Sequence, residues 1–104
     1  MPKRAMEVLT ESMFYVLMAF HAGPMCGMDI AAYIQRRTQG RICMGPATLY
    51  TILSKFEREN WIQEVRIDGR KRTYRLTERG RSAYEAELKR LRQCVADAEE
   101  EESP

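Results

Sequence analysis

The hydrophobic pattern of this chain changes abruptly near residue 60. Before that point apolar residues recur at helical spacing, whereas residues 61–67 and 72–76 are rich in β-branched and aromatic side chains. Asp68 and Gly69, between these two segments, are a strong hairpin signal, and we expect Arg70 and Lys71 to lengthen the loop. Helical spacing then returns. The sequence therefore predicts a mainly α fold with a small β-hairpin before its last helix.

Two helices are predicted in the first 40 residues. Thr10 is a candidate N-cap for the first, which runs to about His21 and carries apolar residues around most of its circumference. That distribution indicates burial on more than one side. Gly23 and Pro24 break this helix, and a second, short helix opens at Gly27 and stops near residue 40.

A third helix is expected to begin at Gly45 and Pro46, because proline is well tolerated at the first helical position. Asn60 is its expected end. Its core face follows the i, i+3, i+4, i+7 pattern through Leu49, Ile52, Leu53 and Phe56. Small, hydroxyl-bearing and basic residues lie largely on the opposite face: Ala47, Thr48, Tyr50, Thr51, Ser54, Lys55 and Arg58. Such a face is suited to a DNA major groove, and the alternative is a solvated helix face.

Thr77 is expected to cap a final helix that ends at residue 98. Its apolar residues recur at steps of four, three and four, the spacing of a packed helix pair: Tyr84, Leu88, Leu91 and Val95. We expect this stripe, with Met13 and Leu17 of the first helix, to form a homodimer interface. The alternative is packing against the core of the same chain. Residues 99–104 are expected to form a disordered acidic tail.

The charge of the chain is unevenly distributed. Its formal net charge is only +2, yet residues 36–81 contain twelve basic and five acidic side chains. Three consecutive cations, Arg70, Lys71 and Arg72, fall at the predicted hairpin, where they are free to neutralise phosphates. A short helix, a second helix and then a basic hairpin is the order of a winged helix-turn-helix. Double-stranded DNA is therefore the expected partner.

Other functional classes find little support in the sequence. Cys26, Cys43 and Cys94 are widely spaced, and His21 is the only histidine, so neither a zinc site nor a disulfide framework is indicated, and no cofactor is expected. No nucleophile and base, carboxylate pair or phosphate-binding glycine loop suggests an enzyme. No apolar run reaches the roughly 20 residues of a membrane span, and the N-terminus lacks a signal peptide, so a cytoplasmic location is expected.

The sequence resembles the PadR family of bacterial transcriptional regulators. The matching features are Leu9, Thr10 and Glu11 before the first helix, Gly27, residues 47–50 with Leu53, residues 56–62, and residues 72–80. The last of these is similar to the family's "LTxxG" start of the C-terminal helix. Two departures are Thr51, where the family often has proline, and Asn60, where glycine is usual.

The resemblance implies a homodimer held by the first and last helices, with the third helix in the major groove and the hairpin on the DNA backbone. Repression is the family's usual mode of action. Family members also respond to small molecules near the dimer interface, so a small-molecule effector is a further implied partner. The first helix supplies candidate residues for that pocket, and the alternative is that they belong to the core: Met13, Phe14, Met18 and Phe20.

Together these features predict a winged helix-turn-helix with a C-terminal dimerisation helix. The DNA-binding domain spans residues 1–76, the dimerisation helix residues 77–98 and the acidic tail residues 99–104. The expected function is sequence-specific transcriptional regulation, as a repressor on a palindromic operator. The rival interpretation is a winged-helix protein-interaction module that does not bind DNA.

Overall fold

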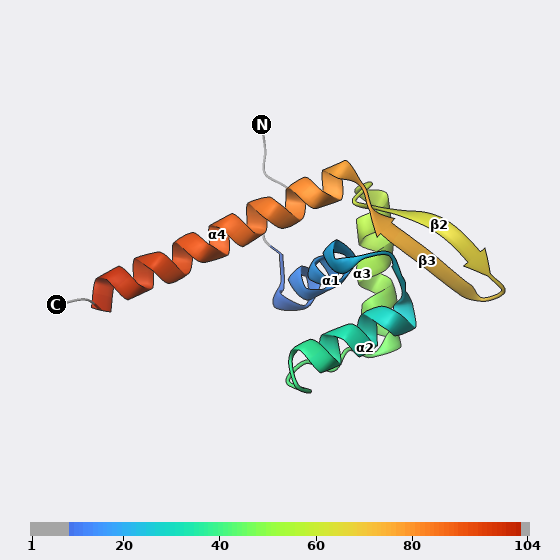
Figure 1. Ribbon diagram of the computed structural model, residues 1–104, viewed down its shortest axis with the longest axis horizontal. Helices are drawn as coiled ribbons and strands as arrows, with labels where there is room; N and C mark the ends of the chain where they lie inside the picture. Colours follow the sequence, from blue (N-terminus) through green and yellow to red (C-terminus); the bar gives the residue numbers. More distant parts are fainter. Residues whose placement is uncertain (1–8, 103–104) are drawn as a thin grey trace.

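The computed structural model describes residues 9–102, and this part of the chain contains four helices and a three-stranded sheet. In order the elements are α1 (Glu11–Ala22), β1 (Met25–Cys26), α2 (Gly27–Arg37), α3 (Pro46–Arg58), β2 (Ile62–Asp68), β3 (Lys71–Leu76) and α4 (Glu78–Glu102). Figure 1 shows α1, α2 and α3 grouped together, with the β2–β3 hairpin, the wing, projecting to one side and α4 to the other. The predicted winged helix-turn-helix architecture is confirmed.

Local sequence signals set most of the helix ends. The Thr10 hydroxyl accepts a hydrogen bond from the Met13 amide at 3.1 Å, so it caps α1 as predicted. Pro46 is the first residue of α3. Asn60 has a φ of 62°, the left-handed conformation that stops a helix and that asparagine tolerates better than most residues.

The three N-terminal helices share one apolar core. Its fully buried side chains come from α1, α2 and α3: Val16, Leu17, Ile30, Ile34, Leu53 and Phe56. Of the first-helix residues considered for an effector pocket, Met13 and Phe20 belong to this core, while Phe14 and Met18 are half-buried against it. Burial of this kind is the main force that holds α3 in a fixed orientation.

The predicted dimer interface needs a correction in its first half. Met13, Leu17 and Tyr84 are only 6%, 0% and 8% exposed within a single chain, so they have almost no surface left for a partner. The reason is that all three belong to the core of the single chain, in which the Tyr84 ring of α4 stacks on Phe14 of α1 at a centroid distance of 5.4 Å. The alternative weighed from sequence, packing against the chain's own core, holds for these three residues.

The sheet contains one strand that the sequence pattern did not predict. β1 is two residues long and pairs antiparallel with β3, Met25 opposite Tyr74 and Cys26 opposite Thr73. The strand order is β1-β3-β2. Two residues are too few to show the alternation by which strands are recognised. This short pairing places the start of α2 beside the wing.

The hairpin turn is also tighter than expected. Asp68 pairs directly with Lys71, so the loop is Gly69 and Arg70 alone. Gly69 has a φ of 61° at the first turn position, where a type II′ turn requires a positive value. The prediction of a lengthened loop was wrong. Only Arg70 lies at the tip, and Lys71 and Arg72 begin β3.

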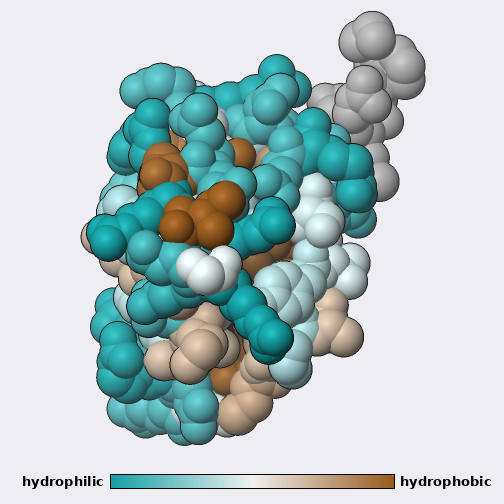
Figure 2. Space-filling model, turned by 90° about the vertical axis from the view of Figure 1, so that its right-hand side faces the viewer, coloured by the Kyte–Doolittle hydropathy of each residue, from teal (hydrophilic) through white to brown (hydrophobic). Residues whose placement is uncertain are grey.

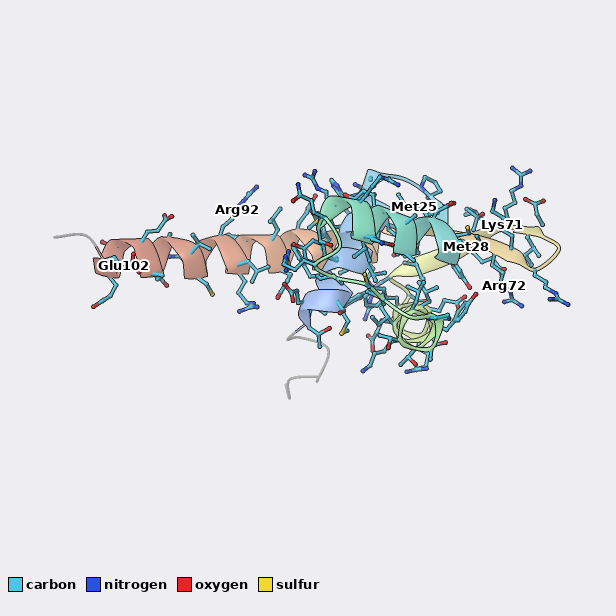
Figure 3. All side chains as sticks on the ribbon, turned by 90° about the horizontal axis from the view of Figure 1, so that it is seen from below. Met25, Met28, Lys71, Arg72, Arg92 and Glu102 are labelled. Carbon is cyan, nitrogen blue, oxygen red and sulfur yellow. The ribbon has the colours of Figure 1, made fainter. Side chains whose placement is uncertain are left out.

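The last helix is longer than predicted. α4 continues to Glu102, so the expectation of disorder was wrong for residues 99–102, and residues 103–104 lie outside the described part of the chain. Glutamate is a good helix former, and the Gln93 amide donates to Asp97 one turn later at 2.8 Å. Residues 92–102 are exposed and stand away from the other elements (Figures 1 and 3). No helix in residues 9–102 is both long and apolar enough to cross a membrane.

The base of the wing is fastened to the end of α3. The Thr77 hydroxyl donates to the Asn60 carbonyl at 2.6 Å and accepts from the Gly80 amide at 3.0 Å. The Thr77 amide donates to the Trp61 carbonyl at 3.0 Å. Thr77 is therefore both the predicted cap of α4 and the clamp that closes the wing.

Gly80 is the most sterically restricted position of this joint. A Cβ there would collide with the Trp61 carbonyl, whose backbone atoms have little freedom to move. We expect Gly80→Ala to lower the free energy of unfolding by about 1–3 kcal/mol through overpacking. Urea denaturation followed by circular dichroism measures this change. Gly27→Ala is the matched control, since its Cβ would meet the Leu49 side chain at an ordinary 3.6 Å; equal stabilities of the two variants would contradict the account.

Candidate nucleic-acid interface

The exposed face of α3 carries the predicted polar set. Six of its seven members are exposed and Lys55 is half-buried; the six are Ala47, Thr48, Tyr50, Thr51, Ser54 and Arg58. The Thr51 hydroxyl donates to the Ala47 carbonyl at 2.9 Å, which leaves its oxygen lone pairs available as acceptors. Four of these side chains are short, namely Ala47, Thr48, Thr51 and Ser54, whereas Lys55, Arg58 and the 61% exposed Tyr50 are long.

A buried threonine fixes the turn that leads from α2 toward α3. Thr38 is only 8% exposed, and its hydroxyl donates to the Ile34 carbonyl at 2.8 Å and accepts from the Ile42 amide at 3.1 Å. Arg41 ties the same turn to α1 through Glu11 at 3.1 Å and the Tyr15 hydroxyl at 3.1 Å. These hydrogen bonds raise the pKa of Arg41, which stays charged. The turn that precedes α3 is therefore held by hydrogen bonds, in addition to the packing of the core face of α3.

The start of α2 faces the wing. Cys26 precedes α2, and the Asp29 carboxylate accepts from its thiol at 3.2 Å and from its amide at 3.5 Å. The thiol is buried, since Cys26 is 3% exposed. Met28, by contrast, is 83% exposed, the largest exposure among the large hydrophobic side chains of residues 9–102.

The wing presents its cations in two directions. Consecutive residues of a strand point to opposite faces, so Lys71 and Arg72 leave β3 on different sides, and Figure 3 labels both at the wing. The Arg72 guanidinium lies 3.8 Å from Glu64, whose buried Oε2 accepts no hydrogen bond from the described residues. Burial raises the pKa of Tyr74, and Glu57 and Glu64 raise it further, so its phenol is neutral at physiological pH.

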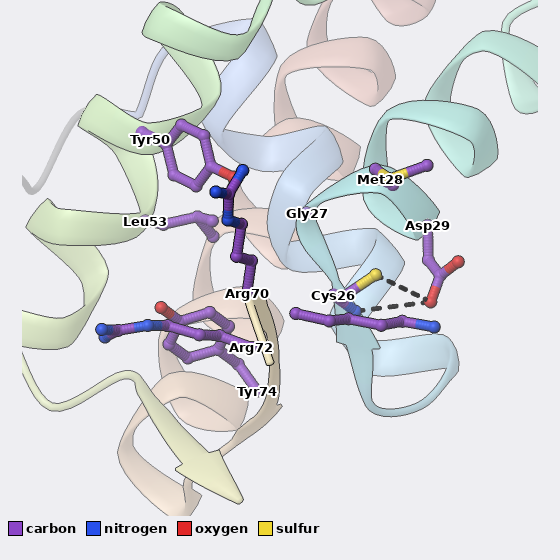
Figure 4. Close-up of a pocket in the computed structure, with 10 residues that line it drawn as sticks. Cys26, Gly27, Met28, Asp29, Tyr50, Leu53, Arg70, Arg72 and Tyr74 are labelled. Carbon is purple, nitrogen blue, oxygen red and sulfur yellow. Dashed lines mark hydrogen bonds between the residues drawn. The ribbon is translucent and has the colours of Figure 1, made fainter. Parts of the chain in front are cut away.

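The wing, α3 and the start of α2 meet around one concave site of about 420 Å³, here called the wing cleft. It is lined by Cys26, Gly27, Met28, Asp29, Tyr50, Leu53, Arg70, Lys71, Arg72 and Tyr74. Figure 4 shows the Arg70 side chain reaching across the cleft toward the Tyr50 ring. Tyr50 of α3 and the wing cations therefore belong to one surface.

Sequence reasoning found only part of this surface. Tyr50, Arg70, Lys71 and Arg72 were predicted and line the wing cleft, whereas Thr48, Thr51, Ser54 and Lys55 belong to α3 outside it. Residues 26–29 were not predicted as site residues, because the β1–β3 pairing that brings them to the wing leaves no periodic signal. At the wing end of the molecule the surface is mostly hydrophilic, interrupted by small apolar patches (Figure 2).

Residues 16–86, more than half of the chain, match the family model described as "Transcriptional regulator PadR-like family". The chain belongs to the PadR-like family. Its members are transcriptional regulators and not enzymes, in agreement with the expectation from sequence. A search of curated proteins by sequence gave no match.

Solved PadR-type structures share the fold. A transcriptional regulator from Clostridium thermocellum superimposes with a TM-score of 0.76 at 19% identity, over 88% of this chain and 92% of that one. A PadR family regulator from Clostridium difficile gives 0.71 at 17% identity, over 85% and 94%. Bacillus subtilis PadR, solved in complex with operator DNA, gives 0.67 at 23% identity, over 76% of this chain and 47% of that protein.

Proposed function

We propose that this chain is a sequence-specific DNA-binding repressor that acts in the cytoplasm as a homodimer on a palindromic operator. The observation that carries the proposal is the wing cleft, where Tyr50 of the reading helix and the wing cations line one concavity. The structure of B. subtilis PadR in complex with operator DNA supports the same mode of action for this fold.

The exposed face of α3 has the properties needed to read base edges. Short side chains such as Ala47, Thr48 and Ser54 let a helix approach the floor of a major groove closely. The hydroxyls of Thr48 and Ser54 donate and accept, while Thr51 offers its oxygen as an acceptor because its hydrogen is used within the helix. Sequence preference then resides mainly in α3.

The wing supplies contacts that do not depend on sequence. Arg70 and Lys71 form no ion pair within the described residues, so their charges are available to phosphates. Arg72 is held loosely by Glu64 at 3.8 Å and gains a stronger partner when a phosphate approaches. The exposed Tyr50 hydroxyl adds a donor at the other wall of the cleft.

The distal half of α4 is the proposed dimerisation element. Leu91 is half-buried and Val95 is 56% exposed, and both lie on the apolar stripe that begins at Tyr84 and Leu88. Because the distal half of α4 stands clear of the other elements, a second copy is the simplest cover for Leu91 and Val95. A two-fold axis there would present two reading helices to half-sites about 34 Å apart.

A mobility-shift titration with a palindromic duplex from the protein's own promoter region tests the DNA-binding proposal. We expect binding that weakens steeply between 50 and 200 mM salt, values that span the range over which counterion release lowers affinity by orders of magnitude. The triple variant Arg70→Ala, Lys71→Ala, Arg72→Ala should bind at least about tenfold more weakly to all duplexes and show a flatter salt dependence.

The matched control removes three other exposed cations, Arg79, Arg81 and Lys89 of α4, which lie outside the wing cleft. That variant should keep nearly the wild-type affinity. No shift of any duplex at low salt by the wild-type protein would refute DNA binding and favour a protein-interaction module. Equal losses in the two triple variants would show that net charge, not the wing, determines affinity.

The dimer proposal predicts that Leu91→Glu combined with Val95→Glu gives monomers in sedimentation velocity. Placing like charges against one another at a helix interface is unfavourable, and both positions are exposed enough for each subunit to remain folded. Val65→Glu is the control, because Val65 is 47% exposed but lies on the wing. A Leu91→Glu, Val95→Glu protein that remains a dimer would place the interface elsewhere.

A further inference from the structure

The floor of the wing cleft is apolar although the cleft lies on a basic surface. Leu53, Tyr74 and Cys26 are 2%, 5% and 3% exposed and form its base. Met28 and the Tyr50 ring rise at its edges, 83% and 61% exposed. A methionine so exposed gains nothing from burial in its own chain. The side chain is flexible and polarisable, and such residues adapt readily to an apolar ligand.

The charge around this apolar floor is positive. Figure 4 shows the Arg70 side chain extending across the cleft and Arg72 lying along the Tyr74 ring. The acidic residue of the cleft, Asp29, has its carboxylate engaged by the thiol and amide of Cys26. The cleft thus offers the guanidinium of Arg70, which forms no ion pair within the described residues, above an apolar and aromatic surface.

The volume of about 420 Å³ falls within the roughly 300–1,000 Å³ of small-molecule sites. A DNA phosphate pairs with the cations but leaves the apolar base of the cleft uncovered. An organic anion can pair with the cations and also cover the apolar base. We propose that the wing cleft binds a small organic anion with an apolar or aromatic body. Its anionic group pairs with Arg70, and its body lies on Met28, Leu53 and the Tyr50 ring.

Occupation of this cleft has a regulatory consequence, which rests on the proposed DNA-binding function. The ligand covers Tyr50 and Arg70, which we assign to DNA contacts. Anion and operator therefore exclude one another, and no conformational signal between distant sites is required. A ligand that binds only the DNA-free protein competes with DNA by mass action. The loss of apparent DNA affinity then depends on the ligand concentration relative to the dissociation constant of the ligand.

Fluorescence titration with 8-anilinonaphthalene-1-sulfonate, an aromatic sulfonate, tests the site without DNA. We expect saturable binding to the full chain that is at least about fivefold weaker in Met28→Ser and in Arg70→Ala. Val65→Ser is the control, since Val65 is an exposed apolar residue outside the lining of the wing cleft, and it should bind like wild type. The neutral analogue N-phenyl-1-naphthylamine should bind at least about tenfold more weakly.

Three results would overturn the proposed site: unchanged sulfonate affinity in both cleft variants, loss of binding in Val65→Ser, or equal affinity for the neutral analogue. Circular dichroism verifies that each variant is folded, and Met28 and Arg70 are exposed positions that tolerate substitution. In a second arm the sulfonate should displace operator DNA in a mobility shift, and displacement that persists undiminished in Met28→Ser would refute the exclusion. Absence of any DNA shift would refute the proposed function alone, since the titration is done without DNA.

Discussion

The clamp between the end of α3 and the start of α4 determines where the wing lies. The Thr77 hydroxyl joins the Asn60 carbonyl to the Gly80 amide, and the Trp61 carbonyl occupies the space where any other residue at position 80 would place its Cβ. Because both ends of the hairpin meet at this joint, the wing is oriented by the same helix that carries the polar face. Without that constraint a two-stranded hairpin would be only marginally ordered.

The wing cleft forms because of this joint and because of a second contact, the pairing of β1 with β3. The two-residue strand β1 pairs with β3 and carries the start of α2 to the wing, so three elements distant in sequence line one concavity. The apolar base of the cleft is an extension of the core through Leu53 and Tyr74, while its rim is cationic. Leu53 and Tyr74 thus belong both to the hydrophobic core and to the lining of the wing cleft.

Local signals made much of this structure predictable. The Thr10 cap, Pro46 at a helix start, Asn60 in the left-handed conformation and Thr77 before α4 each act within a few residues, and each is found as expected. What depends on distant partners was missed. Strand β1 exists only because β3 is beside it, and burial of Met13 and Leu17 depends on how the chain's own elements pack around α1.

The helical state of residues 99–102 was missed for a different reason. Their charge suggested a disordered tail, but a run of glutamates also has high helix propensity. Here it continues an existing helix, which avoids the cost of a new nucleus. The exposed polar positions of α3 were predictable because amphipathic spacing determines which face is left outside. The identity of the cleft as a combined apolar and cationic site was not, since it arises only in three dimensions.

An NMR titration of the isotope-labelled protein with a palindromic operator duplex tests most directly whether the polar face of α3 and the wing form one DNA-binding surface. The account predicts that amide shifts appear together in α3 around Thr48–Lys55 and at the wing turn, Gly69 and Arg70, and saturate at the same DNA concentration. Shifts confined to the exposed half of α4, or present in the wing and absent from α3, would contradict it.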